Sequence, residues 1–336
     1  MNGSIQVSGL NKYLDQLGTP ILREAVLGST TFTAPNPITK IDGVKYQHQI
    51  NLITSLINVQ ADGCPADGSI INATGSVTLS GQTLTVCPLQ FLESVCNKDL
   101  EQYWTGMLMP IGSYIEELSP KELAVVYLAD KVDKIAGFLD DMFWVGNSSG
   151  AGTYSTDVNM TKCNGLLYQL DYVAGITSSV IVSGTYSGAL VRSTAVDCID
   201  KLIGTMVTSA PQMLNKADLT MFVNYADFQT LLFALRDKNL FHVEVGQSSD
   251  ATVTADQWFI YPGTQVLVKA TRGLNAVTGR IVLTYATNLV MGNDAPNDSS
   301  NSQLWWENLA QKMYYRSAFK LGASVAYPQF IVYKNA

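Results

Sequence analysis

The chain has 336 residues, of which 47% are hydrophobic and only 15% are charged, and its formal net charge is −7. Because it has no run of Lys and Arg, it lacks the basic patch of a specific nucleic-acid-binding protein. No apolar stretch approaches the roughly 20 residues of a membrane span, and the first ten residues lack the features of a signal peptide. A surface that is polar but uncharged can be buried against another subunit at a low desolvation cost, which favours an assembling protein.

The five cysteines are odd in number and stand at no metal-ligand spacing. We therefore expect them to be reduced thiols in a cytosolic setting. They are Cys64, Cys87, Cys96, Cys163 and Cys198.

The first 88 residues predict extended structure after one short helix. Residues 11–26 have helical apolar spacing interrupted by Pro20, and residues 29–42 form an arm with two prolines and no periodicity. Alternating apolar and polar residues predict strands within 44–59 and 77–86, the second bent by a turn at Ser80-Gly81. Residues 44–88 would thus be a long two-stranded excursion. A lone ribbon is marginal in water, so we expect it to lie against a neighbouring subunit.

Residues 119–147 predict one long helix. Ser119 and Glu122 match an N-terminal capping box, Pro120 suits the first turn, and Gly146 offers a left-handed C-terminal stop. Residues 119–145 would span about 40 Å at 1.5 Å per residue. One apolar stripe runs along this helix through Val125, Leu128, Val132, Ile135, Leu139 and Met142.

The remaining elements mix helices and strands. We expect helices at 89–107, 187–210 and 226–236, strands at 165–173, 179–183, 219–224, 265–269, 280–285, 289–291 and within 319–333, and a strand or helix at 304–315. Residues 148–158 and 293–302 read as loops. The alternation is too irregular for a doubly wound sheet, so the sequence predicts an α+β fold.

The usual signatures of catalysis are missing. Only two histidines are present, His48 and His242, and no nucleophile–base pairing is visible. Residues 146–150 spell G-x-S-x-G, but that motif requires a strand before it and a helix after it, whereas a helix precedes it here. We therefore predict no catalytic residue and no cofactor site.

The carboxylates form no obvious site either. Asp140-Asp141 and Glu116-Glu117 are adjacent in sequence, and neighbours on a helix point about 100° apart. Residues 293–302 carry oxygen ligands but lack the spacing of a calcium-binding loop, so a solvated turn is the simpler interpretation. We predict no metal site. An enzyme or ligand-binding protein of unusual α+β fold stays a lesser alternative.

The order of elements resembles the major capsid proteins of tailed double-stranded DNA bacteriophages, which share the HK97 fold. Residues 217–239 (ADLTMFVNYADFQTLLFALRDKN), 262–274 and 280–294 are similar to the strands and helix of that family's axial domain, and 314–333 (YYRSAFKLGASVAYPQFIVY) to its closing strands. Within that family, the sequence most resembles the capsid proteins of crAss-like phages and other phages of Bacteroidetes hosts.

The resemblance implies a domain order. It gives an N-terminal arm at 1–43, an E-loop at 44–88, a peripheral domain at 89–164 with its spine helix at 119–145, an axial domain at 165–290 and returning strands at 291–336. Because no Lys lies between Lys45 and Lys98, the covalent cross-link that some family members form through the E-loop is not expected.

The resemblance also implies a function and partners. The chain would self-assemble as hexamers and pentamers into an icosahedral virion capsid, built in the host bacterial cytoplasm around double-stranded DNA. Its partners would be a separate scaffolding protein, a portal and decoration proteins, with no membrane. An encapsulin-type compartment shell, which has the same fold, is the alternative.

Overall fold

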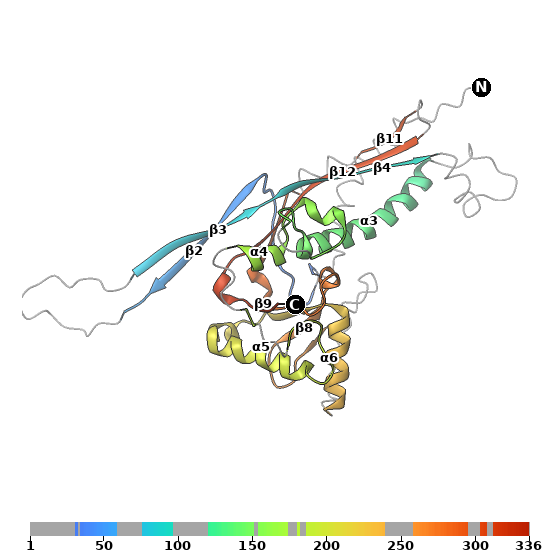
Figure 1. Cartoon of the computed structure of the whole chain (residues 1–336). Helices are drawn as coiled ribbons and strands as arrows, with labels where there is room; N and C mark the ends of the chain where they lie inside the picture. The colour runs from blue at the N-terminus through green and yellow to red at the C-terminus, as the bar shows by residue number, and fades with distance from the viewer. Residues whose placement is uncertain are drawn as a thin grey trace, which may run out of the picture.

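The structure is a computed structural model of the chain. The residues it describes are 31–32, 34–58, 76–96, 120–150, 154–173, 180–181, 186–238, 258–294, 303–307 and 312–335. They form an elongated body with a two-stranded ribbon at one end, a long helix lying along strands toward the other end, and a compact sheet-and-helix unit to one side (Figure 1). Within those ranges, no helix is both long enough and apolar enough to cross a membrane.

The longest strand, β12 (Lys312–Val325), is the centre of a five-stranded sheet. Helix α3 (Pro120–Val145) runs along this sheet (Figure 1). The ring of Phe91 in β4 contacts Phe138 of the helix and Phe319 of β12, at centroid distances of 5.0 and 5.2 Å. Strand β12 pairs with three strands: β10 (Leu289–Asn293), β11 (Gln303–Glu307) and β4 (Cys87–Cys96). Strand β1 (Thr39–Ile41) completes the sheet by pairing with β10.

The second sheet has six strands and is covered on both faces. Along β6 (Leu219–Val223), Met221 faces a core formed with α5 (Ala195–Ser209) and α6 (Tyr225–Asp237), whereas Phe222 faces Trp144 of α3. This explains why all five residues of β6 are buried. The strand order is β5 (Val180–Ile181), β13 (Val332–Lys334), β9 (Ile281–Tyr285), β6, β8 (Leu267–Ala270) and β7 (Trp258–Ile260).

Short helices fill the connections. Gly273 lies so close to α3 that a Cβ there would stand 2.5 Å from the carbonyl oxygen of Asp140, which seats the connection after β8 on the long helix. These helices are η2 (Val158–Lys162), α4 (Leu166–Tyr172), η4 (Pro211–Asn215), η5 (Arg272–Leu274), η6 (Ala286–Asn288) and η8 (Pro328–Phe330).

The long helix predicted from the sequence is confirmed, but its C-terminal stop differs. Ile135, Leu139 and Met142 of the predicted stripe are buried. Gly146 is not in the left-handed region; it is needed because a Cβ there would lie 2.6 Å from the carbonyl oxygens of Met142 and Cys163. The glycine therefore serves close packing and not backbone conformation.

Two predicted elements are wrong. The start of the helix predicted at 89–107 is strand β4, because pairing with β12 along its whole length outweighs local helical spacing. The strand predicted at 165–173 is helix α4, whose residues Leu166, Leu167 and Leu170 bury a helical face. In both cases tertiary packing decides the conformation of a short apolar run.

The remaining predictions were mostly right in type. The helix predicted at 187–210 begins only at Ala195, after a turn that contains Gly188 at a φ of +77°. The expectation of reduced thiols is wrong for one pair, because Cys87 and Cys163 form a disulfide. The helix predicted at 11–26, His242 and all but the first two residues of the loop 293–302 lie outside the described residues.

Candidate assembly surface

The ribbon projects from the body of the fold (Figure 1). Strands β2 (Gln47–Leu56) and β3 (Ser76–Thr85) pair only with each other in the part of the chain that the structure describes. They are antiparallel, with His48 opposite Leu84 and Ile53 opposite Leu79. Figure 1 shows the ribbon leaving the body as a single extended arm.

The root of the ribbon buries one of its faces. Leu52 and Leu84 are 6% and 0% exposed, and Leu84 belongs to a small core under the ribbon. Glycine makes this contact possible, because a Cβ on Gly292 of β10 would lie 2.7 Å from Leu84. The root is also hydrogen-bonded to the body, through Val44 N to the carbonyl oxygen of Asn293 at 3.0 Å.

The outer half of the ribbon exposes apolar side chains on the opposite face. Ile53, Val77 and Leu79 are 68%, 67% and 74% exposed, and Ile57, just beyond β2, is 81% exposed. In the register of the ribbon, Ile53 and Leu79 are on the same side, whereas Leu52 and Leu84 are on the other. The apolar face of both strands thus changes sides where the ribbon leaves the body.

This change of side corrects the predicted turn at Ser80-Gly81. In the sequence, apolar residues occupy odd positions up to Leu79 and even positions from Leu84 onward, and a turn would explain such a shift. The structure instead has one continuous strand, with Ser80 opposite Leu52 and Gly81 opposite Asn51. The shift marks the point at which the apolar surface no longer faces the subunit's own core.

The segment before the ribbon, residues 31–41, contacts both sheets. Strand β1 adds to β10 in parallel. Upstream of it, the Thr31 hydroxyl donates to the Asp140 carboxylate and accepts a 2.8 Å hydrogen bond from the Trp144 indole. Asn36 donates to Thr220 of the second sheet at 2.9 Å. The segment 31–41 therefore contacts α3, β6 and β10 at once.

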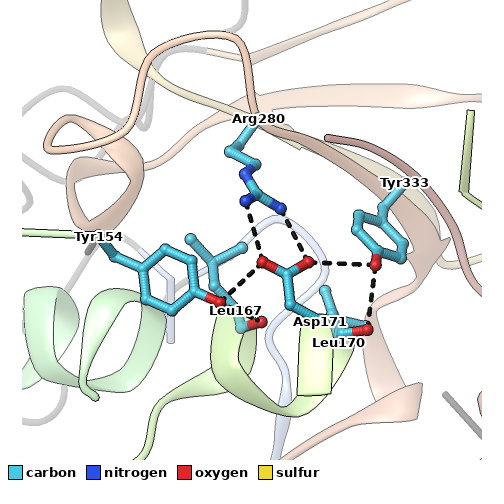
Figure 2. Close-up of polar contacts among 6 residues, drawn as sticks. All are labelled: Tyr154, Leu167, Leu170, Asp171, Arg280 and Tyr333. Atoms are coloured by element: carbon cyan, nitrogen blue, oxygen red, sulfur yellow. Dashed lines mark hydrogen bonds and ion pairs between the residues drawn. The ribbon is translucent and has the colours of Figure 1, made fainter. Parts of the chain in front are cut away.

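A buried polar cluster ties the second sheet to α4. The Arg280 guanidinium binds Asp171 with two nearly equal contacts of 2.9 Å, and both side chains are about nine-tenths buried (Figure 2). The hydroxyls of Tyr154 and Tyr333 donate to the same carboxylate at 2.7 and 3.1 Å (Figure 2). Burial, then the interactions with Asp171, raise the pKa of both tyrosines, so they stay protonated donors.

A second buried cluster surrounds Asp227 of α6. Its carboxylate accepts backbone N–H groups of Leu190 and Gly279 at 2.8 and 2.6 Å. Close by, the ammonium group of Lys334 donates to the carbonyl oxygens of Gly188 and Gly279 at 2.6 and 2.7 Å. These bonds fasten the turn before α5 and the last strand, so both clusters serve to hold the body rigid.

The carboxylate pair of α3 divides between two environments, as its helical geometry predicts. Asp140 is buried against Thr31, whereas Asp141 lines a hollow of about 170 Å³ with Asp157 and Arg272. Burial raises the pKa of Asp141 to about 6, against the lowering effect of Arg272. Among the described residues, no three His, Cys, Asp or Glu side chains are grouped to hold a metal ion.

His48 and the G-x-S-x-G sequence at residues 146–150 lie on separate parts of the fold. His48 is exposed on the ribbon, far along the fold from residues 146–150, which follow the end of α3. What the sequence reasoning missed is the buried cluster around Asp171. Its members lie on four separate segments of the chain, and no local spacing connects them.

The fold matches that of tailed-phage capsid chains. A chain of the satellite phage P4 procapsid, which includes the size determination (Sid) protein, superposes with a TM-score of 0.52 at 11% identity, over 98% of this chain and 99% of that one. A chain of the capsid of Myoviridae phage XM1 gives 0.51 at 14% identity, over 93% and 90%. One of Gordonia phage Cozz gives 0.50 at 11%, over 89% and 84%.

These likenesses establish the α+β, HK97-type fold that the sequence resemblance implied. At 11–14% identity they show the fold and not the function. No protein-family model matches the chain, and no curated protein matches it in sequence.

Proposed function

We propose that the chain is a major capsid protein, which self-assembles as hexamers and pentamers into the icosahedral head of a tailed double-stranded DNA phage. The observation that carries this proposal is the ribbon, whose outer apolar face lies opposite to the face that packs at its root and joins none of the cores formed by the described residues. A fold shared over nearly the full length of phage capsid chains supports it. The closeness to crAss-like phages belongs to the same proposal.

The energetics of the ribbon favour a second copy as its partner. A two-stranded ribbon is marginal in water on its own, and this one has four large apolar side chains exposed on its outer part. Fully burying each would contribute about 1.5–3 kcal/mol. A neighbouring subunit in a closed shell supplies such a surface at every position of the lattice.

The domain order of the HK97 fold can then be assigned. Residues 1–43 would be the N-terminal arm, 44–88 the E-loop, 89–164 the peripheral domain with α3 as its spine helix, 165–290 the axial domain and 291–336 the returning strands. The arm segment 31–41, which bonds to both sheets, would hold the peripheral and axial domains in one orientation.

The other partners follow from chemistry and from the resemblance. No Lys lies between Lys45 and Lys98, so the lattice would be held without a cross-link through the ribbon. The net charge of −7 would limit adhesion to the packaged DNA, which would lie near the shell without specific contacts. A separate scaffolding protein, a portal and decoration proteins complete the proposed virion, assembled in the host bacterial cytoplasm.

The direct test shortens the ribbon without disturbing its root. Residues 53–79 are replaced by Asn-Gly, a dipeptide that favours a tight hairpin turn between Leu52 and Ser80, which are opposite each other in the register. The proposal expects a folded subunit that forms no shells by electron microscopy, whereas the parent chain forms them. Shells formed by the shortened chain would overturn the role of the ribbon. In native particles, DNA supports a phage head, and a cargo enzyme without DNA indicates a compartment.

A further inference from the structure

We propose that the Cys87–Cys163 pair is a redox-controlled lock, which is a dithiol while the subunit folds and closes to a disulfide when the protein meets an oxidant. The inference concerns a bond within one subunit and goes beyond the proposed function. It can be tested on unassembled chain and on particles alike.

The bond joins the root of the ribbon to the end of the long helix. Cys87 is the first residue of β4, two residues after β3 ends, and Cys163 follows η2. The two are 76 positions apart in sequence, and the segment between them includes the whole of α3. Closure therefore makes the ribbon root and the C-terminal end of α3 one covalent unit.

The fold places both cysteines without help from the bond. Cys87 stands opposite Leu321 in the β4–β12 ladder. The segment that carries Cys163 is bonded to the end of α3 on both sides, by Asn147 N to Met160 O at 2.8 Å and Gly165 N to Gly146 O at 2.7 Å. The Cα atoms of the pair are 5.8 Å apart, within the usual range for a disulfide. The dithiol form thus needs no different backbone.

The environment of the pair indicates when it closes. Cys163 is 2% exposed and Cys87 is only partly buried, so Cys87 is the thiol that glutathione disulfide reaches first. A reducing cytosol keeps cysteines as thiols during synthesis and folding. Closure is a two-electron oxidation: with glutathione disulfide, both thiols lose their protons, one S–S bond forms in the protein, one S–S bond breaks in glutathione, and two glutathione thiols are released.

Two other cysteines serve as internal controls. Cys96, at the far end of β4, and Cys198, in α5, are both unpaired in the structure. Burial raises the pKa of the Cys198 thiol, which makes that thiol a poor nucleophile at neutral pH. Oxidation by glutathione disulfide should therefore be directed to the Cys87–Cys163 pair, because only there does the fold hold two thiols side by side among the described residues.

The experiment traps thiols and then measures stability. The full chain, expressed in a bacterial cytosol, is treated with N-ethylmaleimide during lysis under denaturing conditions, and alkylated peptides are identified by mass spectrometry. A second sample is incubated with glutathione disulfide before trapping. We expect alkylation at both Cys87 and Cys163 in the first sample, and a peptide joined through the two residues in the second.

Thermal unfolding gives the consequence. The oxidised chain should melt roughly 5 °C higher than the same chain kept in dithiothreitol, because the bond restricts the unfolded state. This difference should persist in Cys96→Ser and vanish in the Cys87→Ser/Cys163→Ser double variant. If the double variant does not fold, the comparison of oxidised and reduced wild-type chain still decides.

Three results would overturn the proposal. The pair could already be joined in the cytosolic sample, which would make the bond constitutive. Both residues could be modified separately by glutathione without joining each other. The oxidised and reduced chains could melt at the same temperature, in which case the bond locks nothing.

Discussion

Ile53 and Leu79 stand directly opposite each other on the two strands of the ribbon, and both are exposed, at 68% and 74%. A directly opposed apolar pair is a unit of sheet stabilisation that normally covers a core. Here it is on the face opposite to the one that packs at the ribbon root. Among the described residues, nothing in the subunit's own cores covers this face, which is the basis for proposing a second subunit as its partner.

The first prediction concerns that pair. Replacing it in the double variant Ile53→Asp/Leu79→Asp should prevent assembly, because two charges would have to be desolvated at the contact with a neighbour. Two like charges directly opposite each other weaken the pairing of the outer ribbon, but the thermal midpoint of the subunit body should change little, since neither side chain packs in the described cores. Sedimentation velocity and negative-stain electron microscopy check the first result, and thermal unfolding the second.

A matched control lies one position away. Thr78 is exposed on the opposite face of the same strand, so Thr78→Asp introduces a charge at the same distance along the ribbon. Its effect on assembly should be clearly smaller. If Thr78→Asp blocked assembly as completely as the double variant, the apolar face would not be the surface that matters.

The second prediction separates the root of the ribbon from its outer half. Leu84→Ala removes a side chain that is 0% exposed and packs over Gly292, so it should lower the free energy of unfolding by about 2–5 kcal/mol. Leu79→Ala, on the same strand but exposed, should change it by less than about 0.5 kcal/mol. Urea unfolding of the unassembled subunit measures both, and equal losses would contradict the two-part description of the ribbon.

The third prediction tests the buried cluster of Figure 2. Asp171→Asn removes the counter-charge of the buried Arg280 guanidinium. The Nε atom of Arg280 has no hydrogen-bond partner among the described residues, so the group depends on Asp171. The expected loss is about 3–5 kcal/mol. Tyr333→Phe removes hydrogen bonds to Asp171 and to the Leu170 carbonyl oxygen but keeps the ion pair, so it should cost about 1–3 kcal/mol. A tyrosine variant as unstable as Asp171→Asn would refute this ranking.

The fourth prediction is a pH dependence centred on Asp141. Its pKa is about 6 in the folded chain against 3.8 for the unperturbed group, chiefly because of burial. Between these pH values the folded state binds more protons than the unfolded state, so this group makes stability fall as pH rises through the window. Asp141→Asn removes that dependence. The stability of the variant relative to wild type should increase from pH 4 to pH 7 in urea unfolding, and a constant difference would contradict the raised pKa.

The sequence predicted elements well where one periodicity extended over many residues. Helix α3 was found because its apolar stripe repeats from Val125 to Met142, about five turns at 3.6 residues per turn, and is followed by Gly146 at the C-terminal end of the helix. Strand β6 was found because a run buried on both faces is almost entirely apolar, here with Thr220 as its single polar residue. Both patterns are local, so no knowledge of distant partners was needed.

Elements whose conformation depends on distant partners were missed. Strand β4 is a strand because β12, more than two hundred positions later, pairs with it. In the sequence, the apolar residues change from odd positions (up to Leu79) to even positions (from Leu84). A turn within the segment and a change of the apolar face along one continuous strand both produce this pattern. The pairing register distinguishes a turn from a change of face, because it places Leu52 opposite Ser80 and Ile53 opposite Leu79. The apolar side chains of β2 therefore change faces at the same point of the ribbon as those of β3.

Self-assembly is best tested by negative-stain electron microscopy of the expressed chain, with sedimentation of the same sample, alone and with a scaffolding protein supplied. The wild-type chain should form closed shells, tubes or hexameric and pentameric rosettes, and the chain with residues 53–79 replaced should form none. A wild-type chain that stays a dispersed monomer under both conditions would contradict it.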